Sequence, residues 1–326
     1  MSGLFEAYND LDDLAEGLTA DSAGERRVAV MELADSGQPG AIPLLAKMLG
    51  DPDAGVRRQA ALALGEFDGP ETAAALAIAI ADPEAQVAEA AALSMAELKD
   101  LSAAAPLLPL VRHASAFVRQ SALRALKDLK NPNSLQHALE ALQDAESAVR
   151  IQAVGVIGFL KIEEATPALI AAAGDSDPQV RRAAINALSF SHTRKTAEVI
   201  NAALVDRDWM VREAAAEALG RNMHGASMAP DLIAALNDEF WQVRIKAVRS
   251  LGQTKTAAAV TQICAALSHE QANLRKEAAA ALGEIGDVTA RQSLQAAGDD
   301  LDADVRKTVR WALGRLGDPQ PAQASS

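Results

Sequence analysis

The 326-residue sequence has one cysteine, three tryptophans, one tyrosine and six phenylalanines, and it contains no long run of apolar residues. A single cysteine excludes an internal disulfide and a cysteine-rich metal site. No stretch approaches 18 uncharged apolar residues, so no transmembrane helix and no membrane partner are expected. The first 18 residues hold five acids and no base, which is unlike a secretory signal. We therefore expect a cytoplasmic location.

The sequence also lacks an excess of positive charge. It has 31 Lys and Arg against 44 Asp and Glu, a net charge of -13 and a pI of about 4.9. A general nucleic-acid binder shows a basic footprint, so no nucleic-acid partner is expected. Hydrophobic residues make up 49% and aromatics only 3%. A core of Ala, Leu and Val favours thin, closely packed helices over a β-sandwich or barrel.

A motif of about 31 residues repeats along the whole chain. Each copy centres on an apolar residue followed by arginine, and every step is 31 residues except one of 32. The matching dipeptides are Val56-Arg57, Val118-Arg119, Val149-Arg150, Val180-Arg181, Val211-Arg212, Val243-Arg244, Leu274-Arg275 and Val305-Arg306. Glu25-Arg26 and Val87-Ala88 occupy the same frame, which gives ten repeats. The extra residue is expected in the loop 222–230, where an insertion is best tolerated.

The pattern predicts two helices per repeat, joined by a turn. Apolar residues four apart, such as Leu45 and Leu49, indicate the first helix. The second helix runs from near the Val to a Gly such as Gly65, which we interpret as a helix stop. Small residues such as Ala60 and Ala63 let neighbouring helices approach closely. One repeat cannot bury its own apolar stripe but stacked neighbours can, so the chain is predicted to be a solenoid.

These columns resemble the HEAT-like repeats of the phycobilisome-lyase (PBS lyase) type. The matching residues are the D-P-x-x-x-V-R turn at 51–57 and the A-x-x-x-L-G helix end at 60–65. The resemblance spans residues 4–317. It implies an all-α, armadillo-like fold: a right-handed alpha-alpha superhelix, or HEAT-repeat solenoid, of ten two-helix repeats. The Pro- and Ser-containing tail, 318–326, is expected to be disordered.

The resemblance also implies a range of functions. Repeats of this type mostly serve as protein-binding scaffolds. A minority act in attaching bilin pigments, in DNA repair or as a di-iron hydroxylase. The di-iron relatives need several His-Glu pairs, whereas this chain has one, His269-Glu270. The DNA-repair relatives need a basic concave face, which the net charge of this chain disfavours.

An aspartate lies six residues before most of the repeat arginines. The column contains Asp51, Asp82, Asp144, Asp175, Asp206, Asp238 and Asp300. An Asp in a turn before a helix is interpreted as an N-cap, and the resemblance implies an Asp–Arg ladder that sets repeat stacking. Ala88, His113 and His269 interrupt the columns and are expected to mark looser joints. We therefore interpret the aspartate and arginine columns as structural residues, not as a functional site.

The sequence offers no convincing catalytic or metal site. The histidines are His113, His137, His192, His224 and His269. His192 and His224 follow consecutive second helices, but they lack a neighbouring carboxylate column and are expected to be solvated. Cys264, between apolar neighbours, is expected to be a buried small hydrophobe. No phosphate-binding loop or nucleophile elbow is present. We therefore predict no enzyme activity, catalytic residue, metal ligand or cofactor.

Partner recognition is expected in the variable columns of the second helices, which line the concave face of a solenoid. Met31, Leu62 and Leu93 form an apolar row edged by acids. Ile151, Phe159 and Phe190 form a second apolar spot, and Asn186 lies beside it. In so aromatic-poor a chain, two phenylalanines in register either anchor a partner or lie buried between helices, and both interpretations stay open.

Trp209 and Trp241 occupy equivalent positions at the start of neighbouring second helices. An exposed pair beside Phe240 would be a binding hot spot. The resemblance favours the other interpretation, in which both tryptophans pack between repeats.

The sequence therefore predicts a non-catalytic protein-binding scaffold or adaptor. The apolar residues supply affinity, and the acids steer a basic or neutral protein partner. The alternative is a helper, chaperone or lyase-like factor that loads a cofactor such as a bilin onto another protein. The chain is expected to be a monomer. Head-to-tail self-association is conceivable, because residues 304–317 carry four bases and one acid, opposite in sign to the N-terminal 18 residues.

Overall fold

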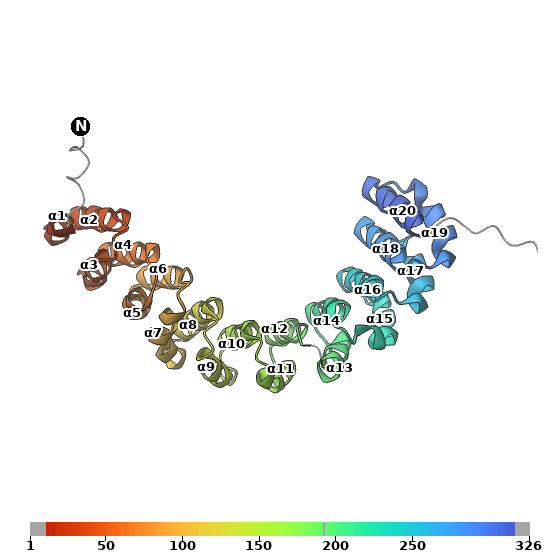
Figure 1. Ribbon diagram of the computed structural model, residues 1–326, viewed down its shortest axis with the longest axis horizontal. Coiled ribbons are helices and arrows are strands. Elements are labelled where there is room, and N and C mark those ends of the chain that lie inside the picture. The colour runs from red at the N-terminus through yellow and green to blue at the C-terminus, as the bar shows by residue number, and fades with distance from the viewer. Residues whose placement is uncertain (1–10, 192, 317–326) are drawn as a thin grey trace, which may run out of the picture. The chain divides into compact units, whose positions relative to one another are not determined.

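The computed structural model describes residues 11–191 and 193–316, and every element within these ranges is helical (Figure 1). The twenty α-helices of this part form ten successive pairs, and short 3-10 turns follow or precede many of them. The predicted all-α fold with two helices per repeat is confirmed. The chain divides into two compact units, the first ending at Lys161 and the second beginning at Ile162. Each unit holds five helix pairs.

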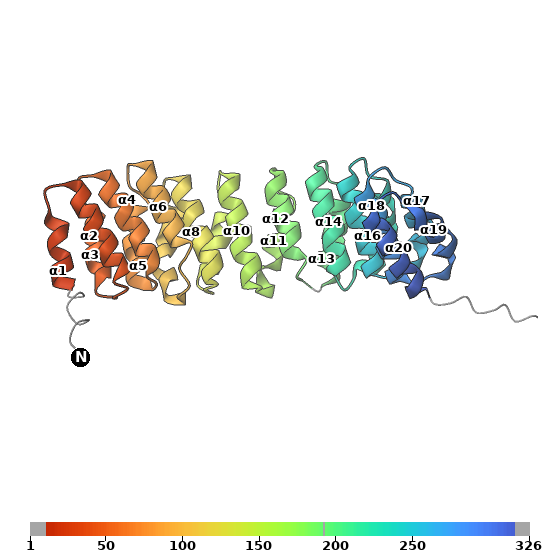
Figure 2. The same cartoon turned by 90° about the horizontal axis from the view of Figure 1, so that it is seen from above.

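In the first unit, the first helices of the repeats are α1 (Leu11–Glu16), α3 (Ala41–Met48), α5 (Pro70–Ala79), α7 (Ala104–Leu107) and α9 (Ser134–Ala141). The second helices are α2 (Ala23–Asp35), α4 (Ala54–Ala63), α6 (Ala85–Met95), α8 (Ala116–Leu129) and α10 (Ser147–Leu160). The second helices lie side by side in one layer (Figure 2), and each packs against its own first helix in the other layer.

In the second unit, the first helices are α11 (Thr166–Ala172), α13 (Arg194–Ala202), α15 (Ala229–Ala234), α17 (Val260–Ala266) and α19 (Arg291–Ala296). The second helices are α12 (Pro178–Leu188), α14 (Trp209–Arg221), α16 (Trp241–Gln253), α18 (Ala272–Ile285) and α20 (Ala303–Arg315). The additional residue of the 32-residue step lies in the segment between α14 and α15, where the 3-10 turn Gly225–Met228 forms.

The repeat columns build the core, as their periodicity predicts. The Val positions, such as Val56 and Val243, and the Leu positions eight residues later, such as Leu64, are fully buried. Leu45 and its counterparts on the first helices face them. Burying one such side chain contributes roughly 1.5–3 kcal/mol. Because one repeat supplies only a few of them, stability depends on stacking against the next repeat.

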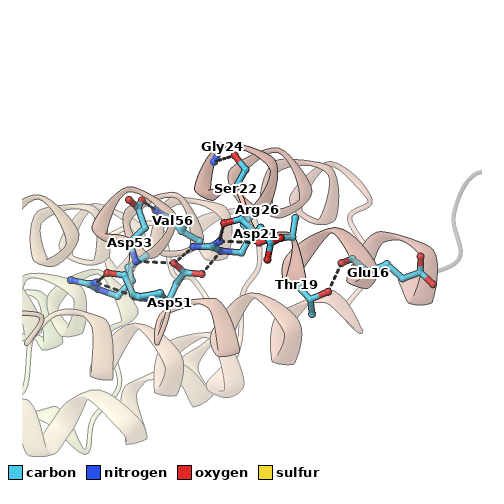
Figure 3. Close-up of polar contacts among 12 residues, drawn as sticks. Glu16, Thr19, Asp21, Ser22, Gly24, Arg26, Asp51, Asp53 and Val56 are labelled. Carbon is cyan, nitrogen blue, oxygen red and sulfur yellow. Dashed lines mark hydrogen bonds and ion pairs between the residues drawn. The ribbon is translucent and has the colours of Figure 1, made fainter.

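Many of the repeat arginines form a link to the following repeat. Arg26 donates from Nε to Asp51 Oδ2 at 2.7 Å and from Nη2 to Asp51 Oδ1 at 2.8 Å (Figure 3). Its Nη1 donates to the carbonyls of Ala20 and Asp21. The same link joins Arg57 to Asp82, Arg119 to Asp144, Arg181 to Asp206, Arg212 to Asp238 and Arg275 to Asp300. The ladder is therefore present at these joints, where the arginine binds the carboxylate of the next repeat.

The interpretation of the column aspartates as N-caps is wrong. Asp51 Oδ1 accepts the backbone N–H of Asp53 at 2.8 Å, which closes the turn before the helix. The cap of α4 is Asp53 itself, whose side chain accepts the N–H of Val56. The helix begins two residues later than the N-cap interpretation assumed, so the column residue Asp51 lies in the turn and binds the ladder arginine. Hydrogen bonds from Arg26 hold the pKa of Asp51 below its ordinary value.

The expected looser packing is found at only one of the two histidine joints. α6 packs less extensively on α8 than the other consecutive second helices of the first unit pack on one another, whereas α16 packs on α18 about as extensively as on α14. Both joints nevertheless lack a complete ladder link. At the joint between Ala88 and His113, both members of the Arg–Asp pair are replaced, and His113 Nδ1 accepts only the N–H of Ser115 at 3.1 Å. His269 accepts the N–H of Gln271 at Nδ1, and its Nε2 lies 2.9 Å from Nη2 of Arg244. Arg244 Nε has no partner there. A neutral ring has only one acceptor nitrogen, so His269 replaces the two-point carboxylate contact incompletely.

The prediction that glycines stop the second helices is confirmed for α4, which ends at Ala63 just before Gly65, and is wrong for the other glycines of the column. Gly220, Gly252 and Gly283 lie inside helices, and a Cβ at Gly252 would come within 2.8 Å of Ala281 Cα on the next second helix. Glycine is therefore needed for the close approach of consecutive helices. The helices that end in a left-handed residue do so several positions later, at Lys130 (φ 52°) and Lys255 (φ 51°), for example.

Candidate functional site

The exposed side chains of the even-numbered helices form a surface that we call the second-helix face of each unit. Within each unit, consecutive second helices pack directly against one another, whereas most first helices contact mainly their own repeat. The fold residues are buried beneath this face, so its outward columns vary without disturbing the ladder or the core. The side chains in these outward columns are therefore the ones available to contact a partner.

In the first unit, the predicted apolar row, Met31, Leu62 and Leu93, lies on α2, α4 and α6. Met31 is 50% exposed and Leu93 59% exposed, whereas Leu62 between them is half-buried. The sequence interpretation missed Val28, which lies one turn before Met31 and is also exposed. Its i, i+3 spacing from Met31 was the signal that could have found it.

An acidic row runs beside the apolar row, four residues further along each helix. It consists of Asp35, Glu66, Glu97 and Asp128, all exposed. Within the described residues, the first three have no ion-pair partner, and Asp128 has only a 3.8 Å contact with its neighbour Lys127. Carboxylates near the C-terminal end of a helix are unfavourable to its dipole. The acidic row therefore keeps a negative field at the surface.

The first unit also contains Ile151 and Phe159, both on α10. Phe159 is 49% exposed, which excludes burial between helices, and Ile151 is half-buried. The ammonium groups of Lys127 and Lys130 lie 5.6 and 5.7 Å from the Phe159 ring centroid. These cation–π contacts occupy part of the ring with groups from the same unit.

The second unit contains Asn186 on α12 and Phe190 just after it. Both are exposed, and Phe190 is 59% exposed, so Phe190 is not buried between helices either. Because Ile151 and Phe159 belong to the first unit, a single apolar spot made of these two residues and Phe190 stays a prediction. The sequence correctly placed each one on a second helix or at its end.

The predicted tryptophan pair lies at the first positions of α14 and α16. Trp209 stacks on Phe240 of the next repeat, with ring centroids 5.3 Å apart and an interplanar angle of 11°. The ladder residue Arg212 lies 5.6 Å from the same Phe240 ring. Trp241 is half-buried. The geometry at Trp209 agrees with the interpretation that this tryptophan packs between repeats.

The second-helix face of the second unit is bridged by ion pairs between repeats. Lys246 on α16 contacts Glu217 on α14 at 2.8 Å. Arg249 on α16 contacts Glu277 on α18 at 2.6 Å. These residues occupy columns equivalent to those of the apolar row and its neighbours in the first unit. The sequence interpretation missed the pairs, because they join positions 28 and 29 residues apart instead of one full repeat.

The structure also places the residues considered for catalysis or metal binding. Cys264 is partly exposed and lines a groove of about 520 Å³ with His269, so its expected burial is wrong. His224, expected to be solvated, is half-buried, and His192 lies outside the described residues. Among the residues that the structure describes, no three His, Cys, Asp or Glu groups are placed to hold a metal ion. No described helix is both long and apolar enough to cross a membrane.

Comparison with known proteins identifies the repeats. A model of HEAT repeats matches residues 11–95, 73–147, 135–220 and 229–314, most of the chain. No curated protein matches the sequence.

Solved structures with low sequence identity share the fold. An engineered protein is 20% identical over 95% of this chain and 99% of its own, with a TM-score of 0.52. A chain from the structure of Kap95p binding to RanGDP is 15% identical over 94% of this chain and 50% of its own, with a TM-score of 0.63. A Kap121p mutant is 13% identical over 94% and 41%, with a TM-score of 0.68. This chain thus spans half or less of the last two.

Proposed function

Because the chain belongs to the HEAT-repeat family, we propose that it is a non-catalytic scaffold that binds protein partners through its second-helix face. The observation that carries this proposal is the apolar row of the first unit, where Met31 and Leu93 are at least half exposed. Large apolar side chains gathered on one surface mark interaction sites more often than isolated ones do. The likeness to Kap95p- and Kap121p-type chains supports the fold on which this function rests.

The proposal includes a finer assignment of the repeats to the PBS-lyase type, which rests on the D-P-x-x-x-V-R turn at 51–57. In this turn the structure gives the Asp and Arg positions their physical role, since Arg57 donates to the Asp51 carbonyl at 3.0 Å while it also binds Asp82. The turn and the ladder are one unit, so scaffold stability is separable from the variable columns that would contact a partner.

The test compares the two layers of the same unit. The tagged full chain is used to capture proteins from a lysate of its source cells, alongside Leu93→Asp and the matched variant Ile78→Asp. Ile78 is a 74% exposed apolar residue on α5 in the first-helix layer. Both positions tolerate a carboxylate without a buried charge, so neither variant is expected to unfold the chain.

We expect Leu93→Asp to lose at least one stoichiometric partner that the wild type and Ile78→Asp both retain. Partners that survive Leu93→Asp but are lost with Ile78→Asp contradict the proposed face. An absorbance scan of the same eluates addresses the loading-factor alternative. A bilin-like chromophore, or a cofactor-bearing protein as the main captured partner, would favour that alternative over a plain scaffold.

A further inference from the structure

We propose that the second-helix face of the first unit binds a helix of a partner protein that has an apolar stripe with lysine or arginine along one side. This inference rests on the proposed function and specifies its partner. The apolar row (Met31, Leu62 and Leu93) receives the stripe, and the acidic row (Asp35, Glu66, Glu97 and Asp128) receives the basic side.

The spacing of the apolar row favours a helical partner that crosses the second helices. Packed helices lie roughly 8–10 Å apart, so consecutive members of the row are separated by about that distance. A helix rises 1.5 Å per residue, so apolar residues about seven positions apart keep step with successive repeats. An extended chain would need an apolar residue about every third position, which its alternation of side chains does not supply.

The acidic row specifies the charge of that partner. Its members lie on α2 and α8, in the 3-10 turn after α4, and just beyond α6, one in each of four consecutive repeats. Asp35, Glu66 and Glu97 have no ion pair with another described residue, and the dipoles of their own helices do not stabilise them. A line of exposed carboxylates attracts cations and speeds the association of a basic partner.

The other side of the apolar row has the opposite character in the first two repeats. Arg27 on α2 and Arg58 on α4 are exposed there, four residues before Met31 and Leu62. A partner with bases on both sides would place some of them against these arginines. The charge pattern therefore selects a helix whose basic residues lie on one side only.

The second unit offers an internal control, because its equivalent face does not have this combination. Glu217 and Glu277 are engaged by Lys246 and Arg249. Glu284 on α18 is exposed and occupies the same column as Glu66 and Glu97, but no apolar row accompanies it. Substituting Glu284 thus changes the same charge at an equivalent position outside the proposed site.

The experiment measures binding of a fluorescent 21-residue synthetic helix to the full chain by anisotropy. The probe has leucine at every seventh position, lysine at the first and fourth positions after each leucine, and alanine or glutamine elsewhere. Three control peptides replace the lysines by glutamate, replace the leucines by serine, or add two central prolines that prevent a helix. We expect the probe to bind, with an affinity that falls at least tenfold for each control peptide.

Protein variants locate the site. We expect the double variant Glu66→Lys, Glu97→Lys and the single variant Leu93→Asp each to weaken probe binding at least tenfold. Glu284→Lys should change it less than twofold. Raising the salt concentration should weaken binding of the wild type and should affect the double variant less. Thermal denaturation confirms that all variants remain folded.

Three results would overturn the inference: no binding of the probe to the wild type, equal loss with Glu284→Lys, or equal binding of the proline-containing peptide. The last result would point to an extended partner. The scaffold function survives any of these outcomes if native partners captured from the lysate still depend on Leu93. It fails separately if no captured protein depends on the second-helix face.

Discussion

The two units use the same repeat to make different surfaces. On the first unit, the columns above the core present the apolar row and the acidic row, of which Asp35, Glu66 and Glu97 have no ion pair with another described residue. On the second unit, related columns are joined between repeats by pairs such as Arg249 with Glu277. Both units keep the arginine–aspartate ladder. The surface chemistry of a repeat is therefore independent of the residues that stack it.

This difference separates two uses of charge. An ion pair between second helices satisfies both partners within the chain and adds to stacking. A carboxylate without such a partner leaves its field available to another molecule. The first unit is therefore the better candidate for binding and the second for rigidity, and the following four predictions test that contrast.

The largest effect is expected at low pH, because protonation of the aspartates breaks the arginine–aspartate ladder that both units contain. Hydrogen bonds from Arg57 and Arg275 lower the pKa of Asp82 and Asp300 in the folded chain. The stability they contribute is fully present above the unfolded pKa of about 3.9 and is lost as pH falls toward the lower folded values. We expect the melting temperature to fall steeply below about pH 4, with both units affected. Thermal denaturation followed by circular dichroism measures this. A flat profile down to pH 2 would contradict the role of the ladder.

Single ladder substitutions should destabilise both units to a similar degree. In the folded chain the Asp82 and Asp300 carboxylates are equally buried, each 9% exposed. Asp82→Ala and Asp300→Ala leave Arg57 and Arg275 without a carboxylate, at a cost of about 2–4 kcal/mol. Hydrogen exchange followed by mass spectrometry reports each unit separately. The exposed Asp13→Ala serves as control, and a large loss in only one unit would show that the ladder is not equivalent in the two.

Surface substitutions should distinguish the units. Glu277→Gln removes the partner of Arg249, and we expect it to lower stability by about 0.5–1.5 kcal/mol. Glu97→Gln removes an unpaired carboxylate near the end of α6, and its effect should be about zero or slightly stabilising. Chemical denaturation of the two variants gives the comparison. Equal losses would mean that Glu97 has a stabilising role in the first unit.

The smallest effect is expected at the left-handed lysines. Lys255→Gly should stabilise the second unit by up to about 1 kcal/mol, because glycine adopts this backbone conformation without a steric penalty. Lys130→Gly in the first unit should gain less, since it also removes a cation–π contact with Phe159. Melting temperatures test the order of the two variants. A greater gain at Lys130 would show that this contact has no stabilising effect.

The sequence predicted most of the fold because a repeat aligns equivalent positions. The buried Val and Leu columns follow directly from the 31-residue period. The ladder was expected from the family resemblance, and only the structure shows that each arginine pairs with the aspartate of the next repeat. The role of Gly252 did not follow, because a glycine near a helix end looks the same whether it stops the helix or admits a neighbour such as Ala281.

Less of the candidate site than of the fold could be predicted from the sequence. The period predicted where Met31 and Leu93 lie, but not that Leu62 between them is half-buried. The pairs Lys246–Glu217 and Arg249–Glu277 depend on the angle at which helices cross, which shifts contacts away from exact register. Cys264 was misjudged because apolar neighbours in sequence point to different sides of a short helix.

The links of the ladder all point the same way along the chain, so its first and last repeats are not equivalent. Every link runs from an arginine to the carboxylate about 25 residues ahead. Arg306, the last donor, reaches only the carbonyls of Asp300 and Leu301 among the described residues. The first acceptor position holds Ala20 in place of an aspartate. A second copy stacked after Arg306 would present the methyl group of Ala20 where the ladder uses a carboxylate, so the contact between the two copies would lack this link.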